Sequence, residues 1–528
     1  MRKLGIGLIG AAACLAAVGV FSLGAAFGQD GASVPLAIES AQTPIVIASD
    51  GSARATKVQA LDLTNVSGEV GEVVVTLSDP KYLLGLTAKV GDVEVGRYDF
   101  NGIFDVDANT PTKPTQIPVQ LDSALVASAR EKSQELSIWT EPSAFASPEL
   151  KVAVGVKSVT VGGIKSRIDA APVEYRFGVL VRDSGWDGVA RYRIPALGYT
   201  KKGTLVAVYD ARYNGFPDLP ADIDVMCSRS FDGGKTWTKM QPVIDMKGED
   251  EKLEGVGDPC ILVDDETGRI WVAALWAHGG YSTAKSEPGL KLGTSGQLVV
   301  SYSDDEGATW SEPRNLTAEL QEGRDWRILF QGPGNGIVTR DGKLVFPAQF
   351  IDKDKNFCST LVWSGDKGKT WTVGTGARDY TCECQVVELN DGALMLNMRN
   401  YSSDPKLRMR SVAITRDLGK TWTEDASSLK ALPCPICQAS VIRVKSVKDG
   451  DDKNLLAFMN PNSQNRRNLM TVKLSEDEGQ TWPRSIMLYA PDGCGYSALA
   501  KIDGDTVGAL YETSGGLMYQ TVKLSDAK

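Results

Sequence analysis

Hydrophobic and polar residues alternate over short stretches from about residue 33 to about residue 168, which is the pattern of half-buried β-strands. Residues 71–77 and 151–156 are clear examples, and turns rich in Gly, Asp and Pro separate such stretches. One segment, residues 121–134, fits a short helix better. The pattern predicts a β-sandwich over residues 29–172, in which we identify no catalytic group.

A repeated motif organises the chain after residue 173. The pattern S/T-x-D-x-G-x-T-W occurs five times, with its aspartates at Asp232, Asp305, Asp366, Asp417 and Asp477. In each copy, the Asp side chain can accept backbone N–H groups, and Gly can take the positive φ that a tight turn requires. Each copy, an aspartate box, is therefore expected to form a hairpin turn over which its Trp packs.

The spacing of these boxes, about 50 to 75 residues, suits the blades of a β-propeller. The predicted fold class is all-β: a six-bladed β-propeller with aspartate-box hairpin turns over residues 173–528, preceded by the β-sandwich. One blade is expected to lack the box, because only five copies are present.

The start of the chain reads as an export signal. Arg2 and Lys3 precede an uncharged stretch, residues 4–28, that is rich in Ala, Gly, Leu and Val. We predict a signal peptide over residues 1–28 that is cleaved after Gly28. The stretch also exceeds the about 20 residues needed to span a bilayer, so an uncleaved anchor is the alternative. Both interpretations place the rest of the chain outside the cytoplasm.

Composition and charge limit which ligands the protein can bind and which kinds of site it can form. The 528 residues carry a formal net charge of −9, which argues against nucleic acid or an anionic membrane as the main partner. Any anionic ligand must therefore meet a local cluster of Arg. The single histidine, His278, excludes multi-histidine metal sites and is expected to line the fold at a strand end. We predict no cofactor, no metal and no obligate protein partner, and a monomer.

Eight of the nine cysteines follow the predicted leader, which contains Cys14. The spacings of Cys382 with Cys384 and of Cys434 with Cys437 superficially suggest a zinc site or a disulfide. The first pair, however, flanks an acidic residue inside an apparent strand. Buried free thiols are therefore the favoured interpretation.

The motif YRIPAL at residues 192–197, just before the first box, gives an indication of function in addition to fold. It resembles the [FY]-R-I-P signature of bacterial sialidases (neuraminidases) of glycoside hydrolase family 33. Residues 181–512 resemble that family in motif order and spacing. The N-terminal segment, residues 29–172, is similar to a sandwich domain that precedes some of its propellers, which makes it a candidate carbohydrate-binding domain. The resemblance implies an exo-α-sialidase whose partners are sialylated glycans of glycoproteins, mucins, glycolipids or oligosaccharides.

The same resemblance assigns three arginines to the carboxylate of sialic acid, here called the clamp arginines. They are Arg193, Arg399 and a third that is either Arg466 or Arg467, with the ungapped spacing to the last box favouring Arg467. Glu512 corresponds to the residue that holds Arg193 in place. Planar guanidinium groups suit this task because they bind carboxylates bidentately, as Lys cannot.

The resemblance also assigns the reacting groups. Asp218 corresponds to the general acid/base, Tyr496 to the nucleophile and Glu383 to the base that activates it. Arg212 corresponds to a supporting sugar-binding arginine, and Asp258, in the loop opening the next blade, is a weaker candidate for the glycerol or N-acetyl side of the sugar. A neutral phenol suits an anionic substrate that would repel a carboxylate nucleophile, and sialidases are known exceptions to the two-carboxylate rule.

Two alternatives remain open at this stage. A non-catalytic propeller that only binds sialoglycans would have lost one of Asp218, Glu383 or Tyr496, and none is replaced. A trans-sialidase variant would keep the same residues, so the sequence does not separate it from a hydrolase.

Overall fold

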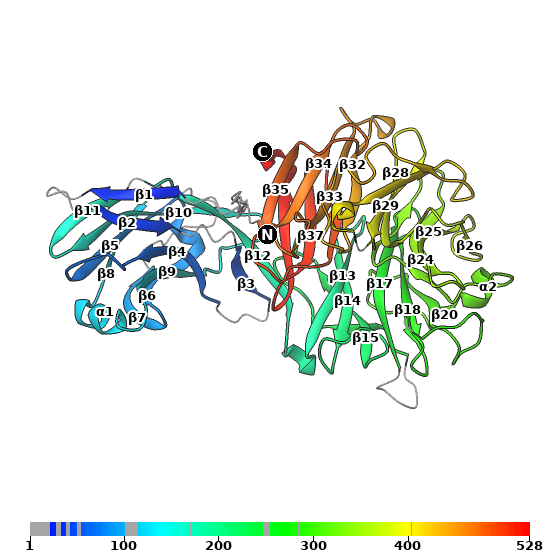
Figure 1. Ribbon diagram of the computed structural model, residues 1–528, viewed down its shortest axis with the longest axis horizontal. Coiled ribbons are helices and arrows are strands. Elements are labelled where there is room, and N and C mark those ends of the chain that lie inside the picture. The colour runs from blue at the N-terminus through cyan, green and yellow to red at the C-terminus, as the bar shows by residue number, and fades with distance from the viewer. Residues whose placement is uncertain are drawn as a thin grey trace, which may run out of the picture.

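The computed structural model describes residues 22–27, 33–38, 43–49, 54–100, 115–168, 170–246, 254–283, 285–402 and 404–528. Most of the predicted leader, Cys14 included, lies outside these residues, while strand β1 (Ser22–Phe27) falls within it. None of the described helices combines the length and the hydropathy needed to cross a bilayer. The molecule is almost entirely β-structure and has two parts that lie side by side (Figure 1).

The N-terminal part consists of two antiparallel sheets that pack face to face. One sheet contains β2 (Ser33–Ile38), β1, β11 (Ile164–Ile168), β10 (Lys151–Val161), β5 (Val70–Leu77) and β8 (Thr115–Gln120). The other contains β4 (Thr56–Asp62), β9 (Glu135–Pro142), β6 (Leu83–Val90) and β7 (Val93–Asp99). Alternate residues of both sheets, such as Val73, Val75 and Ile138, form one buried core. The helix predicted within residues 121–134 is present as α1 (Ser123–Ala129).

The C-terminal part contains six antiparallel sheets, to each of which we assign one blade. The first five follow one another along the chain. The first sheet contains β13 (Arg191–Tyr199), β14 (Leu205–Arg212), β15 (Ile223–Ser230) and β16 (Gln241–Ile244), and the second contains β17 (Gly255–Asp264), β18 (Arg269–Ala277), β19 (Gln297–Ser303) and β20 (Arg314–Asn315), with β22 (Gly334–Asn335) joined in parallel to β17. The third contains β21 (Ile328–Gln331), β23 (Ile337–Val338), β24 (Leu344–Ile351), β25 (Phe357–Ser364), β26 (Thr372–Val373) and β27 (Arg378–Asp379); the fourth contains β28 (Thr381–Glu388), β29 (Leu394–Asn400), β30 (Ser411–Thr415) and β31 (Thr423–Glu424); and the fifth contains β32 (Ser440–Lys445), β33 (Leu455–Pro461), β34 (Met470–Ser475) and β35 (Arg484–Tyr489). A short helix, α2 (Thr317–Gln321), follows β20.

The last sheet closes the ring with strands from the two ends of the propeller part. It consists of β36 (Ser497–Lys501), β37 (Thr506–Glu512), β38 (Gly516–Lys523) and, outermost, β12 (Val173–Asp183). The inner strands of the six sheets contact one another in a closed cycle, and β36 meets β13. These observations confirm the all-β propeller preceded by a β-sandwich.

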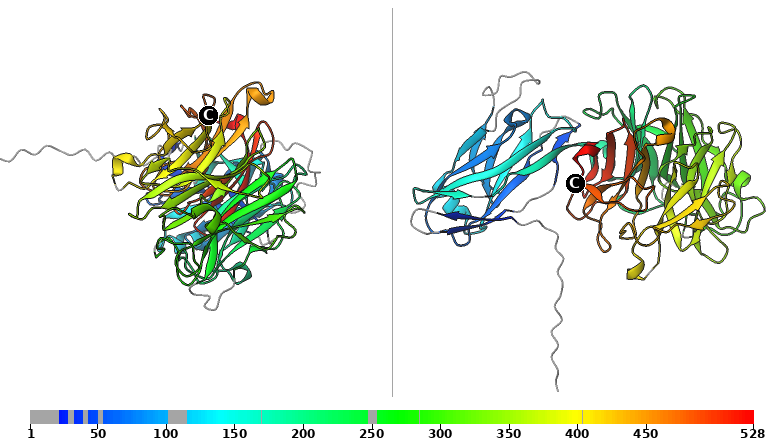
Figure 2. Two further views of the ribbon diagram at one scale, coloured as in Figure 1. Left: turned by 90° about the vertical axis from the view of Figure 1, so that its right-hand side faces the viewer. Right: turned by 90° about the horizontal axis from the view of Figure 1, so that it is seen from above.

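Strand β12 also joins the two parts of the molecule. Its first half pairs with β10 of the sandwich, and its second half pairs with β38 of the propeller. A short strand, β3 (Ile45–Ala48), runs parallel to its middle. The domain boundary predicted after residue 172 therefore falls at a strand that both parts share, and the C-terminus lies at this junction (Figure 2).

All five aspartate boxes lie in hairpins between the third and fourth strands of their sheets, as predicted. In the first box, Asp232 Oδ1 accepts the backbone N–H of Thr236 at 3.0 Å, and Oδ2 accepts its hydroxyl at 2.6 Å. Gly234 has φ +90°, and Trp237 Nε1 donates to the Gly234 carbonyl at 3.0 Å. The sixth sheet has no box because its fourth strand, β12, comes from the start of the propeller part and no hairpin connects it to β38.

Candidate active site

The residues predicted to act on substrate gather at one end of the channel enclosed by the inner strands. Arg193 lies near the start of β13, Asp258 near the start of β17 and Glu383 near the start of β28, while Tyr496 directly precedes β36. Because the inner strands of the ring run in the same direction, their first residues lie at the same end of the channel. The propeller thereby joins positions that are hundreds of residues apart in sequence.

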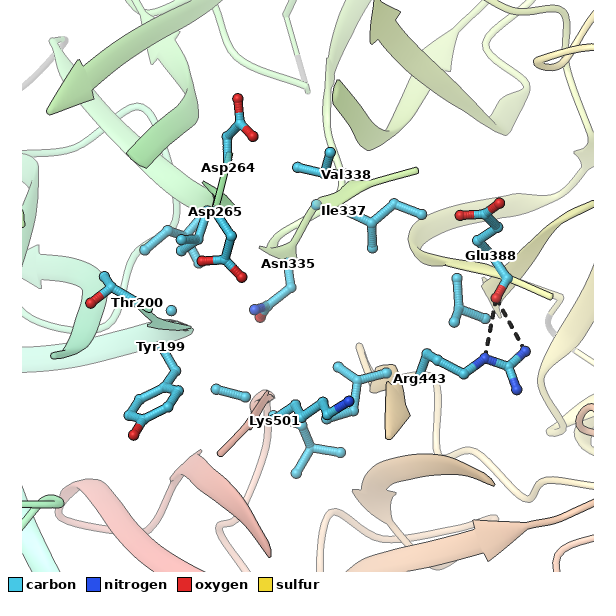
Figure 3. Close-up of a pocket in the computed structure, with 18 of the residues that line it drawn as sticks. Tyr199, Thr200, Asp264, Asp265, Asn335, Ile337, Val338, Glu388, Arg443 and Lys501 are labelled. Carbon is cyan, nitrogen blue, oxygen red and sulfur yellow. Dashed lines mark hydrogen bonds between the residues drawn. The ribbon is translucent and has the colours of Figure 1, made fainter. Parts of the chain in front are cut away.

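The opposite mouth holds a separate cavity of about 910 Å³. It is lined by residues near the other ends of the same strands, including Tyr199, Asp264, Glu388 and Lys501 (Figure 3). None of the predicted site residues lines it.

Three of the inner strands are irregular where they carry a site residue. The strand register shifts between Arg193 and Ala196 in β13, between residues 257 and 260 in β17, and between residues 381 and 384 in β28. Ile194 and Asp258 have positive φ values of 55° and 58°. A β-bulge turns a side chain out of the regular alternation, so these shifts direct the site residues into the channel mouth. Asp258 therefore lies within a bulged strand and not in the loop that the sequence suggested.

Tyr496 and Glu383 form a directly bonded pair. The Tyr496 hydroxyl donates to Glu383 Oε1. Arg399 Nη1 bonds to both partners, at 2.5 Å from Glu383 Oε2 and 3.0 Å from the Tyr496 oxygen. Burial raises the pKa of Tyr496 well above its ordinary value, and the Glu383 carboxylate raises it further. The phenol is therefore protonated at neutral pH and already in contact with a base.

Glu512 secures the first clamp arginine from behind. Its Oε1 accepts from Arg193 Nε at 3.1 Å, and its two oxygens also accept the backbone N–H groups of Ile194 and Tyr496 at 2.9 and 3.0 Å. Burial is the largest effect on the pKa of Arg193 and would lower it, but the charges of Glu512, Tyr496 and Asp218 and the hydrogen bond to Glu512 together outweigh burial, and the pKa is raised. A Cβ on Gly495 would lie 2.1 Å from Glu512 Oε2, so the glycine is needed for this close approach.

The structure distinguishes the two candidates for the third clamp position. Arg467 lines the pocket beside Arg193, its guanidinium lies 5.7 Å from the centre of the Tyr496 ring, and its Nη2 donates to the Ile436 carbonyl at 3.1 Å. The Arg466 side chain is 70% exposed and pairs with Asp492 at 3.2 Å. The Arg193 guanidinium is 5.2 Å from the same Tyr496 ring. Arg193, Arg399 and Arg467 thus converge around one tyrosine.

Asp218 lies above this group on an exposed loop. Its Oδ1 accepts from Arg212 Nη1 at 2.6 Å and from Arg193 Nη1 at 3.4 Å. Burial would raise the pKa of Asp218, but the charge and hydrogen bond of Arg212, followed by the charge of Arg193, lower it below the ordinary value. The carboxylate is therefore ionised at neutral pH when nothing is bound.

Asp210 is a supporting residue that the sequence analysis missed. It is buried, and its Oδ2 accepts from Arg212 Nε and Nη2 at 3.1 and 2.8 Å, while Oδ1 accepts the Asp258 backbone N–H at 2.9 Å. Burial raises the pKa of Asp258 well above its ordinary value, and the charge of Asp210 adds to the rise. The sequence feature that could have identified Asp210 is its spacing of two residues from Arg212, which places both side chains on one face of β14.

The structure also places the single histidine and the cysteines. His278 directly follows β18, as predicted, and its Nδ1 is 2.8 Å from Glu254 Oε2. The eight described cysteines are buried free thiols, and no set of His, Cys, Asp and Glu in the described residues could hold a metal ion.

Comparisons with known proteins agree with this arrangement. Residues 203–509 match the family model of the BNR repeat-like domain, which is more than half of the chain. A sialidase of Bacteroides fragilis is 46% identical over 388 residues, covering 71% of this chain and 70% of that protein. A sialidase of Micromonospora viridifaciens is 34% identical over 350 residues, covering 65% of this chain but only 53% of that protein. The solved structure of Hadza microbial sialidase Hz136 superposes with a TM-score of 0.80 at 34% identity, over 92% of this chain and 99% of that one.

Proposed function

The chain belongs to the bacterial exo-α-sialidases, and from this premise we propose that it is an exported, retaining hydrolase that releases terminal α-linked sialic acids from glycans through a covalent intermediate on Tyr496. The observation that carries the proposal is the Tyr496–Glu383 pair encircled by the three clamp arginines.

The clamp arginines bind the substrate carboxylate, which is attached to the anomeric carbon. Arg193 and Arg399 are held by carboxylates and Arg467 by a carbonyl, so their planes are fixed before substrate arrives. Fixed guanidinium forks bind a carboxylate without the cost of ordering flexible side chains. This places the anomeric carbon next to the Tyr496 hydroxyl oxygen.

In the first chemical step, the Tyr496 oxygen attacks the anomeric carbon while its proton moves to Glu383. The bond from that carbon to the aglycone oxygen breaks, and Asp218 donates a proton to the leaving oxygen. In the second step, water attacks the anomeric carbon, Asp218 accepts its proton, and the bond to Tyr496 breaks as Glu383 returns the proton. Two displacements at one carbon give net retention.

Substrate binding itself prepares Asp218 for its acid role. In the free protein, the Arg212 and Arg193 guanidinium groups keep the pKa of Asp218 low. When the substrate carboxylate binds Arg193, it neutralises part of that positive field. The pKa of Asp218 then rises, which favours protonation at the point where the leaving oxygen needs a proton.

Incubation with a fluorogenic α-sialoside, followed immediately by NMR of the released sugar, tests this function. We expect free sialic acid, released first as the α anomer. Absence of hydrolysis would contradict sialidase activity, and initial release of the β anomer would contradict retention. A transfer product in place of the free sugar would instead identify a trans-sialidase.

Export is tested on the full-length chain expressed in a bacterial host. The uncharged stretch after Arg2 and Lys3 supports cleavage after Gly28, so the mature protein outside the cytoplasm should begin at Gln29 by mass spectrometry. An intact N-terminus in the membrane fraction would favour the anchor instead.

A further inference from the structure

A second pocket is lined by two of the clamp arginines, Arg193 and Arg467. Its volume is about 320 Å³, which is at the lower end of the range for small-ligand sites. Its walls include Arg191, Arg193, Arg467 and Phe216, together with residues 493–495 and 512–514. Three arginines but only one carboxylate, Glu512, line it, so the pocket is locally positive in a chain whose net charge is −9.

Arg191 supplies charge that the clamp does not use. It lies two residues before Arg193 in the regular part of β13, so both side chains project from the same face of the strand. Its Nη1 donates to the Ser514 carbonyl at 2.6 Å and to Ser184 Oγ at 3.2 Å. No carboxylate among the described residues pairs with it, and its guanidinium lies 4.0 Å from the centre of the Phe216 ring.

The pocket lies next to Asp218, the proposed proton donor to the leaving oxygen. Phe216 is 67% exposed and lies on the same loop as Asp218, two residues earlier. Asp218 must reach the leaving oxygen, and its Oδ1 is 3.4 Å from Arg193, which forms part of the pocket wall. A sugar attached to that oxygen therefore extends next to Phe216 and Arg191.

We propose that this pocket is an aglycone subsite that recognises a negatively charged group on the leaving sugar, with Arg191 as its anion-binding residue. The inference rests on the proposed function. Two aglycones present such a group: a second sialic acid, whose carboxylate is carried by α2,8-linked chains, and a sugar bearing a sulfate ester. Arg191 offers the fork geometry that binds either oxyanion, and Phe216 offers an exposed face for the apolar side of the sugar ring.

The test compares the full-length protein with its Arg191→Gln variant on three substrates. They are α2,8-linked disialic acid, 3′-sialyllactose with a sulfate ester on its galactose, and unmodified 3′-sialyllactose as the neutral reference. Glutamine retains a donor for the Ser514 carbonyl and removes the charge. Arg466→Gln is the matched control, because Arg466 is a nearby exposed arginine outside the pocket.

The measured quantity is the ratio of kcat/KM for each charged substrate to kcat/KM for the neutral one. We expect Arg191→Gln to lower this ratio about tenfold for at least one charged substrate, since a charge-assisted pair is lost. The substrate that shows the loss identifies the source of the anion. Arg466→Gln should leave the ratio as in the unsubstituted protein.

An equal loss on all three substrates, or an unchanged ratio on both charged ones, would overturn the subsite. A second measurement needs no variant: in the unsubstituted protein, added NaCl should lower kcat/KM more steeply for the charged aglycone than for the neutral one. Equal salt dependence would also contradict the inference. If the unsubstituted protein hydrolyses none of the three substrates, the proposed function fails, which is a different result.

Discussion

The three clamp arginines differ in what holds each of them. Arg193 is fixed by the Glu512 carboxylate and Arg399 by the Glu383 carboxylate, whereas Arg467 bonds only to the carbonyl of Ile436 within the described residues. Ile436 has φ +53°, a left-handed conformation that is uncommon for a β-branched residue and that orients this carbonyl. In the proposed function, a clamp with one neutral partner keeps an excess of positive charge for the substrate carboxylate.

Replacing Arg467 should therefore disable the clamp, while replacing its neighbour should not. Arg467→Ala is expected to lower kcat/KM by an amount equivalent to about 2–5 kcal/mol, because a buried carboxylate loses a charged partner. Arg466→Ala is expected to leave kcat/KM close to that of the unsubstituted protein, since its side chain is exposed and pairs with Asp492. The opposite order of effects in steady-state kinetics would assign the third clamp position to Arg466.

Tyr496 and Glu383 should behave as one unit because the Tyr496 hydroxyl donates to Glu383, which is the proposed acceptor of its proton. Tyr496→Phe and Glu383→Gln are each expected to lower kcat by about 100-fold or more, and the double variant should be little worse than either single one. Binding of a sialic-acid-like inhibitor to Tyr496→Phe, measured by calorimetry, should persist because the clamp is intact. Near-normal turnover in Tyr496→Phe would show that water attacks directly.

At the scale of elements, the aspartate boxes stabilise hairpins and the bulges direct side chains. In the third box, hydrogen bonds from the backbone and hydroxyl of Thr370, followed by that of Ser364, lower the pKa of Asp366 to about 2. A carboxyl whose pKa is lower in the folded state stabilises the fold above its unfolded pKa of about 3.9. That stabilisation is lost as the pH falls through about 2.

Asp366→Ala is accordingly expected to lower Tm by a few degrees at pH 5, and the difference from the unsubstituted protein should shrink at pH 3 and below. Thermal unfolding followed by circular dichroism measures both values. Asp354→Ala, at an exposed turn position, is the control and should not change Tm at pH 5. A Tm difference that is constant or grows on acidification would contradict the role of the Asp366 charge.

At the scale of the whole molecule, one strand, β12, belongs to a sheet of each domain. β12 pairs with β10 in the sandwich and with β38 in the propeller, and Arg176 and Lys151 both pair with Asp526 near the C-terminus, at 2.9 and 2.8 Å. The ring is closed by this same strand. Loss of the sandwich should therefore weaken the propeller as well.

Differential scanning calorimetry should show one cooperative unfolding transition for both parts. A shortened chain that begins at residue 173 should melt several degrees lower, because β12 loses its partners β3 and β10. A chain that begins at residue 43 retains both strands and should melt close to the full-length protein. Two separate transitions, or equal melting of all three chains, would show that the domains are independent.

The sequence by itself determined the features that depend on neighbouring residues. Five copies of one turn motif predicted hairpins and a propeller, because each box makes its hydrogen bonds within a few residues of chain. The YRIP motif and the order of the boxes identified the family and most site residues by resemblance. Arg466 and Arg467 remained alternatives, because adjacent residues differ in direction and only the fold shows which one faces the pocket.

Only the tertiary structure decided which distant groups meet. Glu512 reaches Arg193 across 319 residues because β37 and β13 belong to adjoining sheets of a closed ring. The support of Asp210 for Asp258, the close approach at Gly495 and the pocket around Arg191 likewise arise from contacts between sheets. Local sequence patterns determine where a strand forms and which of its faces is buried. The closure of the ring determines which other strands lie next to it.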